Sequence, residues 1–311
     1  MNTTVYPAEL TLVDGTDTLV IRPANANAAD GIVCSEWDIG APEVRYTAVP
    51  RAGTDGTEEG AGYLGSRTVT LDLKILGGID RADPAGTVRD AYWFADKLTA
   101  MCHPLRSPVL RISRAGGPTA GQVWSLALRA NPWTVAYGRA SAAYLSMQLT
   151  FTAPLGLLEG PLRGPFSTAQ ASGSEQTQWV FPTSFPMTFG AGDMTVPAIS
   201  MDIEGSSPIG PVVYLIGPSV NPEVRTEDGE RFRFDNLTLV AGQVVEINMD
   251  TGTIRLADTS SGVISDDPSV YQAVDFSVST FWRWGRGTHV MRYYASSGSA
   301  AVQYRERRMS V

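Results

Sequence analysis

Alternation of apolar and polar residues is the feature of this sequence that most restricts its fold. Between residues 67 and 76 every second residue is apolar: Val69, Leu71, Leu73 and Ile75. A period of two places such residues on one face of a half-buried strand. Similar patterns recur at 10–12, 32–39, 124–128 and 145–152. The 31 glycines and 20 prolines supply many turns, so the sequence predicts a mainly β protein.

One segment, 84–102, has helical rather than strand spacing. Asp83 suits the position before a helix, Pro84 suits its first turn, and Pro104 prevents continuation. The apolar positions that recur at this spacing are Val88, Ala91, Tyr92, Ala95, Leu98, Met101 and Cys102. We expect a single helix that packs against one face of a sheet.

The second half of the chain again alternates in short segments. Its clearest hairpin covers 243–256, where Asp250-Thr251-Gly252 forms the turn between two apolar runs. Further strands are expected at 198–204, 212–216, 232–234, 275–280, 288–294 and 300–304. About eight short strands without a helix indicate an antiparallel sandwich.

Two segments interrupt these patterns. Residues 51–65 contain five glycines without periodicity and are interpreted as a long loop between strands. The polar, proline-containing segment 153–184 is interpreted as a linker or an extended crossover. The expected division is therefore a first domain at 1–155, a linker at 156–184 and a second domain at 185–311.

Composition excludes several classes of protein. The net charge is −8 and the pI is about 4.9, which argues against a nucleic-acid binder. Cys34 and Cys102 show no metal-binding or redox spacing, so free buried thiols are expected, although a disulfide stays open. The first residues do not resemble a signal peptide, and no apolar run reaches the roughly 18 residues of a membrane span. These observations predict a soluble chain made in the cytoplasm.

Candidate catalytic residues are few. His103 and His289 are the only histidines, and the nucleophile and zinc motifs Gly-x-Ser-x-Gly and His-Glu-x-x-His do not occur. Neighbouring carboxylates can hydrolyse glycosides, and the candidates are Glu58-Glu59, Glu227-Asp228 with Glu230, and Asp266-Asp267. All lie in polar, turn-like segments without calcium-loop spacing, so we predict no catalytic, metal or cofactor site.

An aromatic cluster near the C-terminus has two interpretations. Phe281, Trp282 and Trp284 could stack on a sugar, or they could be core or docking residues, which is the preferred interpretation. On a strand, Phe281 would face away from both tryptophans. The charged segment 304–308 is interpreted as a solvated end, with an ion pair to a partner as the alternative.

Several segments, in their order and spacing, together resemble the distal tail proteins of long-tailed, siphovirus-like bacteriophages. They are the residues 65–71 after the glycine-rich loop, the single helix after Ile79-Asp80, and the segments 149–154, 246–254, 281–285 and 294–300.

The resemblance implies an N-terminal β-barrel-like domain with one α-helix, followed by a C-terminal galectin-like antiparallel β-sandwich. It implies a structural virion protein of the tail tip or baseplate, not an enzyme, assembled as a homohexameric ring. That ring would join the tail tube protein to a hub or fibre protein and let DNA pass as cargo, without membrane insertion. The tape measure protein is a further candidate partner. The alternatives are a carbohydrate-binding module on a host cell-wall glycan and, with less support, a glycan hydrolase.

Overall fold

The computed structural model divides the chain into two compact units. It describes residues 7–23, 30–46, 48–50, 57–59, 63–77, 84–114, 122–140, 144–168, 196–258 and 263–309. The first unit consists of Met1–Pro161 with Arg307–Val311, and the second of Leu162–Glu306. The predicted mainly β class is confirmed.

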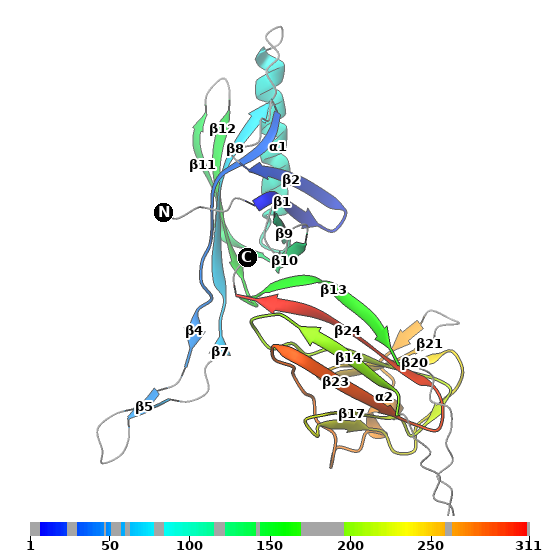
Figure 1. Cartoon of the computed structure of the whole chain (residues 1–311). Helices are drawn as coiled ribbons and strands as arrows, with labels where there is room; N and C mark the ends of the chain where they lie inside the picture. Colours follow the sequence, from blue (N-terminus) through cyan, green and yellow to red (C-terminus); the bar gives the residue numbers. More distant parts are fainter. Residues whose placement is uncertain are drawn as a thin grey trace, which may run out of the picture. The chain divides into compact units, whose positions relative to one another are not determined.

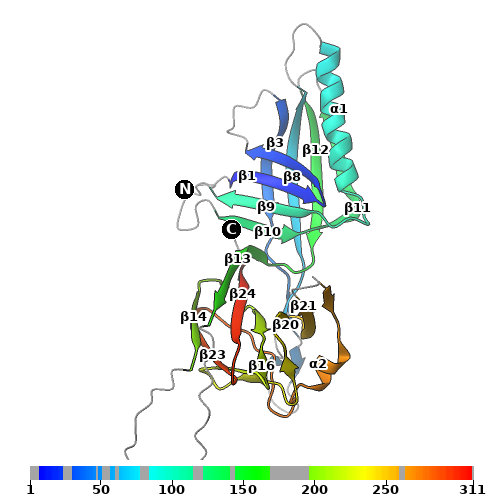
Figure 2. The same ribbon diagram turned by 90° about the vertical axis from the view of Figure 1, so that its right-hand side faces the viewer.

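The first unit is built on a mixed sheet with one helix (Figure 1). Its strand order is β11-β12-β8-β3-β2-β1-β9-β10. The strands are β1 (Pro7–Asp14), β2 (Asp17–Pro23), β3 (Asp30–Ile39), β8 (Arg67–Gly77), β9 (Val109–Arg114), β10 (Val123–Ala127), β11 (Arg129–Ala140) and β12 (Leu145–Ala153). Neighbours are antiparallel except β2 and β3. Figure 2 shows β1, β9 and β10 running across the long strands β8 and β12.

The alternation that predicted strand 67–76 is the pattern of burial on β8. Every apolar position of that pattern is buried, and Leu71 and Leu73 oppose Leu149 and Met147 of β12. Helix α1 (Pro84–Met101) begins at the predicted proline and packs against β8 and β3. Ala95 and Leu98 face the core, whereas Tyr92, which was assigned to the apolar stripe, is half exposed. The apolar stripe is therefore narrower than predicted.

Four short strands continue β3 and β8. They are β4 (Val44–Arg45), β5 (Ala48–Pro50), β6 (Thr57–Glu59) and β7 (Tyr63–Leu64). Two of them, β6 and β7, lie within the segment 51–65 that was interpreted as a loop. β4 pairs with β7 and β5 with β6, and Gly65 N donates to Glu43 O at 2.6 Å. Part of the predicted loop 51–65 is thus a two-stranded extension (Figure 1). This extension was not predicted from the sequence, because glycines have no side chain that could contribute to an alternation of apolar and polar residues.

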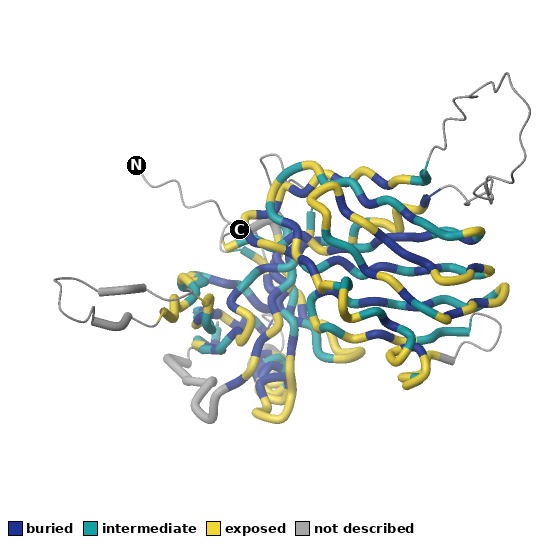
Figure 3. Tube along the Cα trace, turned by 90° about the horizontal axis from the view of Figure 1, so that it is seen from below, coloured by how far each residue is buried: buried dark blue, intermediate teal, exposed yellow. Residues whose placement is uncertain are grey.

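The second unit is the antiparallel sandwich that the sequence predicted. One sheet has the order β13-β24-β15-β20-β21-β22, with β13 (Leu158–Ser167), β24 (Ser299–Arg308), β15 (Val212–Ile216), β20 (Gln243–Asn248), β21 (Thr253–Asp258) and β22 (Val263–Ser265). The other has the order β14-β23-β17-β18, with β14 (Ala198–Ile203), β23 (Gly287–Tyr294), β17 (Glu223–Thr226) and β18 (Arg231–Arg233). Buried and less buried positions alternate along these strands (Figure 3), and their buried side chains form one core.

Short elements close this sandwich: the strands β16 (Ser219–Val220) and β19 (Thr238–Leu239), and helix α2 (Pro268–Gln272). The helix was not predicted. Asp267 caps it by accepting from Ser269 N at 2.9 Å. The expected strand at 275–280 is instead a turn, in which Asp275 Oδ1 accepts from Ser277 N at 3.1 Å. Both differences have one cause: aspartate side chains satisfy local backbone donors and favour turns and helix starts over strands.

The unit boundaries differ from the expected ones. β13 occupies the beginning of the predicted linker 156–184, and the chain leaves the first unit at Pro161 and returns to it at Arg307. β13 was not predicted as a strand, because its prolines and glycines interrupt the alternation of apolar and polar residues. Residues 169–195 lie outside the described residues. The second unit is therefore inserted into the first.

The arginine-rich end, interpreted as a solvated tail, binds within the first unit. Arg307 forms an ion pair with Glu159 at 3.2 Å, and the Arg308 guanidinium lies 4.7 Å from the Trp124 ring centroid. The buried Arg67 donates from Nη2 to Met309 O at 2.8 Å, and burial lowers its pKa. The C-terminal end of the chain is thus held in the first unit by an ion pair, a hydrogen bond and a contact between a guanidinium and an indole ring.

Both cysteine thiols should resist modification in the folded protein. Cys34 and Cys102 are free and buried. Burial raises the pKa of each thiol to about 12, and Asp72 also raises that of Cys34. Because only the thiolate reacts, both thiols should be almost unreactive at pH 8. Iodoacetamide followed by mass spectrometry should show almost no native labelling and two labels after unfolding in urea. Rapid native labelling would contradict the burial of these residues.

Candidate functional site

The aromatic segment before β23 runs through the core of the second unit. Trp284 exchanges two backbone hydrogen bonds with Ile209, both of 2.9 Å. Trp282 and Trp284 are each only 1% exposed, and their ring centroids are 6.3 Å apart. Phe281 is 37% exposed and packs against Phe232, with a centroid distance of 5.1 Å. Exposure therefore alternates along the segment.

This placement separates the two interpretations of the cluster. A sugar-stacking platform requires an aromatic ring with one face open to solvent, and neither indole has one. The structure places Trp282 and Trp284 in the core. Phe281 alone retains exposed ring surface, so the three residues do not form a joint platform.

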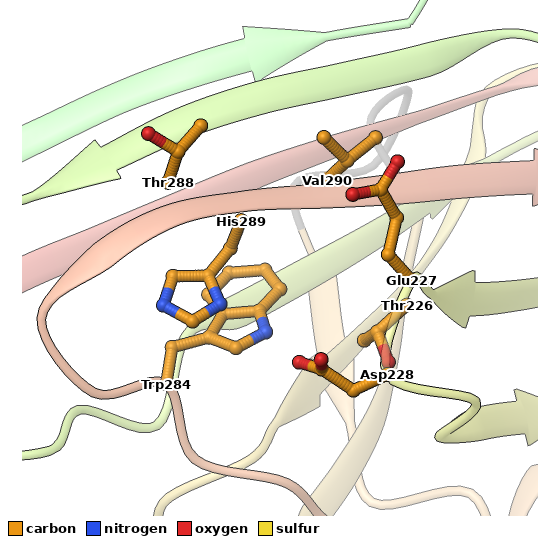
Figure 4. A pocket seen from close by; sticks show the side chains of 7 residues that line it. All are labelled: Thr226, Glu227, Asp228, Trp284, Thr288, His289 and Val290. Atoms are coloured by element: carbon orange, nitrogen blue, oxygen red, sulfur yellow. The ribbon is translucent and has the colours of Figure 1, made fainter.

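A small cavity lies beside Trp284, where the end of β17 meets the start of β23. Its volume is about 40 Å³. Figure 4 shows its lining residues: Thr226, Glu227, Asp228, Trp284, Thr288, His289 and Val290. The His289 ring stacks on the indole of Trp284 at a centroid distance of 5.5 Å. One imidazole nitrogen, Nε2, lies 2.9 Å from Gly285 O. The imidazole and the indole both line the cavity.

The turn after β17 gives the cavity its acidic side. Glu227 forms an ion pair with Arg292 at 3.2 Å, whereas Asp228 lies exposed at the tip of the turn. Burial raises the pKa of the nearby Glu230 carboxyl, Asp228 raises it further, and His289 lowers it. The Glu230 amide donates to Thr226 Oγ1 at 3.2 Å, which holds the turn. Three carboxylates thus lie near one imidazole and one indole.

The other candidate residues have structural roles. His103 Nδ1 accepts from Leu105 N at 3.2 Å, in the turn after α1. Asp266 pairs with Arg255 at 3.0 Å, and Asp267 caps α2. The side chains of Glu58 and Glu59 lie outside the described residues.

The described part of the chain offers no cluster of three or more His, Cys, Asp or Glu residues suited to a metal ion. Nor does any helix within it combine the length and hydrophobicity needed to cross a membrane.

The acidic residues and the histidine of the cavity were singled out from the sequence, but their proximity in space was not predicted. Glu227, Asp228 and Glu230 were interpreted as a solvated turn, and His289 as a strand residue. They meet because β17 pairs with β23, with Thr226 opposite Met291. A strand was predicted at 288–294, which is β23, but none was predicted at β17, so the sequence did not indicate this pairing.

Comparisons with known proteins show what this fold resembles. No protein-family model and no curated protein sequence matches the chain. Among solved structures, the Dit protein (gp 19.1) of phage SPP1 matches 96% of this chain and 98% of its own length. The TM-score is 0.60 and the identity 11%. This chain has the fold of that Dit protein.

The Dit protein is described as a paradigm of the hub adsorption apparatus in phages that infect Gram-positive bacteria. A chain of the phage P2 baseplate, in its activated conformation with Ca, matches 97% of this chain and 99% of its own. Its TM-score is 0.49 and its identity 12%.

Proposed function

We propose that this chain is a structural protein of a phage tail tip, assembled as a ring. The observation that carries this proposal is the likeness to the SPP1 Dit protein over 96% of this chain and 98% of the other. A likeness that includes both units extends beyond a single common sandwich. The fold supports an adsorption-hub role, because that is the role described for the matched protein.

The extension formed by β4 and β7 supports self-assembly. We call residues 43–46 and 63–66 the hairpin arm. Its large apolar side chains, Val44, Tyr46, Tyr63 and Leu64, are between 39% and 69% exposed. Val44 opposes Leu64 across the ladder, and Tyr46 follows on the same face. A two-stranded arm has no further strand or helix of its own to bury its apolar face. An exposed apolar face of this kind is typical of an interaction surface.

In the proposed assembly, six copies form a closed ring through heterologous contacts. The ring joins the tail tube protein to a hub or fibre protein, and DNA passes through it as cargo. The net charge of −8 is suited to passage without adhesion, because like charges repel phosphate. The work of such a protein is geometric, so it needs no catalytic group. The alternative of a carbohydrate-binding module through Trp282 and Trp284 lacks an exposed indole to support it.

Mass photometry and negative-stain electron microscopy of the purified chain test the ring. The expected result is a closed particle of about six times the 33.3 kDa of one chain. The double substitution Val44→Asp/Tyr46→Asp places two carboxylates on the apolar face and should weaken assembly at least about tenfold. Leu105→Asp, which changes an exposed leucine outside the arm, is the matched control. A chain that stays monomeric at all concentrations would count against self-assembly.

A further inference from the structure

The indole nitrogen of Trp284 is a buried donor without an acceptor among the described residues. The residue is 1% exposed. Buried N–H groups in folded proteins almost always have a hydrogen-bond partner. The indole nitrogen of Trp282 is also unpartnered, but of the two tryptophans Trp284 is the one that lines the cavity, so a group that enters the cavity is a candidate partner for it. Figure 4 shows this nitrogen directed towards the side of the cavity where Thr226 and Asp228 lie.

The size of the cavity restricts that group. At about 40 Å³ it exceeds the roughly 10–15 Å³ that a cavity needs in order to hold one water. A hydroxyl with its carbon therefore fits, whereas a whole sugar ring does not. A larger ligand would insert one group and leave the remainder over the rim.

The chemistry of the lining selects among small groups. The indole N–H requires an acceptor, while the carboxylates of Asp228 and Glu227 can only accept, and Glu227 already accepts from Arg292. An ammonium can only donate, so it leaves the indole unpaired. A carboxylate or phosphate can only accept, and it would meet like charges. A hydroxyl both accepts and donates, so it satisfies the indole and a carboxylate together.

The rim favours a ligand with several hydroxyls. Thr288, Glu227 and Asp228 are exposed around the opening, and each offers an oxygen atom that can accept a hydrogen bond. Neighbouring hydroxyls of one saccharide match such a set, because they are fixed on a rigid ring. A single alcohol cannot reach these groups at once.

We propose that the cavity between β17 and β23 binds one hydroxyl group of a saccharide. Trp284 Nε1 donates to the hydroxyl oxygen, and the hydroxyl donates to Asp228. Exposed aromatic stacking, which the sequence suggested for this region, is not involved. The site is independent of ring assembly, because its residues all belong to the second unit and none lies in the hairpin arm.

Nuclear magnetic resonance of the full chain tests this site. The seven tryptophans give separate indole N–H resonances, and comparison with Trp284→Phe assigns that of Trp284. Glucose, galactose and N-acetylglucosamine are titrated, with glycerol at equal concentration as the simple polyol. We expect at least one saccharide to shift the Trp284 resonance in a saturable manner, and glycerol to leave it unchanged.

Asp228→Ala should weaken that binding about tenfold, because it removes the charged acceptor. Asp266→Ala, an exposed carboxylate of the same unit outside the cavity, should leave the binding unchanged. The proposal fails if no saccharide shifts the resonance, if glycerol shifts it equally, or if Asp228→Ala binds as tightly as the parent chain. Because Asp228→Ala leaves the hairpin arm intact, its particle size in mass photometry reports ring assembly separately.

Discussion

Replacing Trp282 with alanine should lower the free energy of unfolding of the second unit by about 3 kcal/mol. Removal of a fully buried tryptophan typically costs about 3–5 kcal/mol, through lost transfer energy and the cavity left behind. The value should lie at the low end, because the indole nitrogen of Trp282 is itself buried without a partner and its loss removes that penalty.

Phe281→Ala is the matched control for this substitution. The neighbouring ring is 37% exposed, and its loss should cost about 1 kcal/mol because less apolar surface leaves the core. Hydrogen exchange of peptides from β15 and β20 would measure the second unit, with β8 and β12 of the first unit as internal reference. If both substitutions cost the same, Trp282 does not serve as a core residue.

Gly156→Ala should lower the free energy of unfolding of the first unit by about 2–5 kcal/mol. Gly156 has a φ of +61°, and an added Cβ would overlap the backbone oxygen of Gly65. Left-handed strain contributes about 1–2 kcal/mol and overpacking about 1–3 kcal/mol. The clash is with backbone, which cannot turn aside as a flexible side chain can.

Gly15→Ala provides a control with nearly the same backbone conformation. Gly15 has a φ of +58°, but nothing lies within 4 Å of an added Cβ. This substitution should therefore cost only the strain, about 1 kcal/mol. Urea denaturation followed by exchange of β8 and β12 amides would compare the two variants. Equal losses would mean that the contact between Gly156 and Gly65 does not constrain the fold.

The local spacing of apolar residues was sufficient to predict the long strands and the long helix. The alternation in 67–76 fixed the buried face of β8, because a period of two assigns each side chain to one face whatever the partner strand. The helical spacing and Pro84 located α1 in the same way. Prediction failed where backbone chemistry overrides the side-chain pattern: at the Asp275 turn, at the Asp267 cap of α2 and in the glycine-rich segment 51–65.

The sites depended on contacts between distant segments. Alternation in 281–284 correctly separated Phe281 from the tryptophans, but it did not say which side is the core. The cavity requires Asp228 and His289 to meet, and the prediction that each was a solvated or strand residue contained no information on their pairing. The same holds for the arginine-rich end, whose partners Glu159 and Trp124 lie far away in the sequence.

The sequence by itself determined the class of the fold, the single long helix and the faces of the principal strands, because these follow from interactions within a few residues. The tertiary structure alone decided that the second unit is inserted into the first, that Trp282 and Trp284 are core residues, and that an unpartnered indole N–H borders an acidic cavity. Each of these depends on which strands pair. Strand pairing joins residues tens of positions apart, and no short-range pattern specifies the partner.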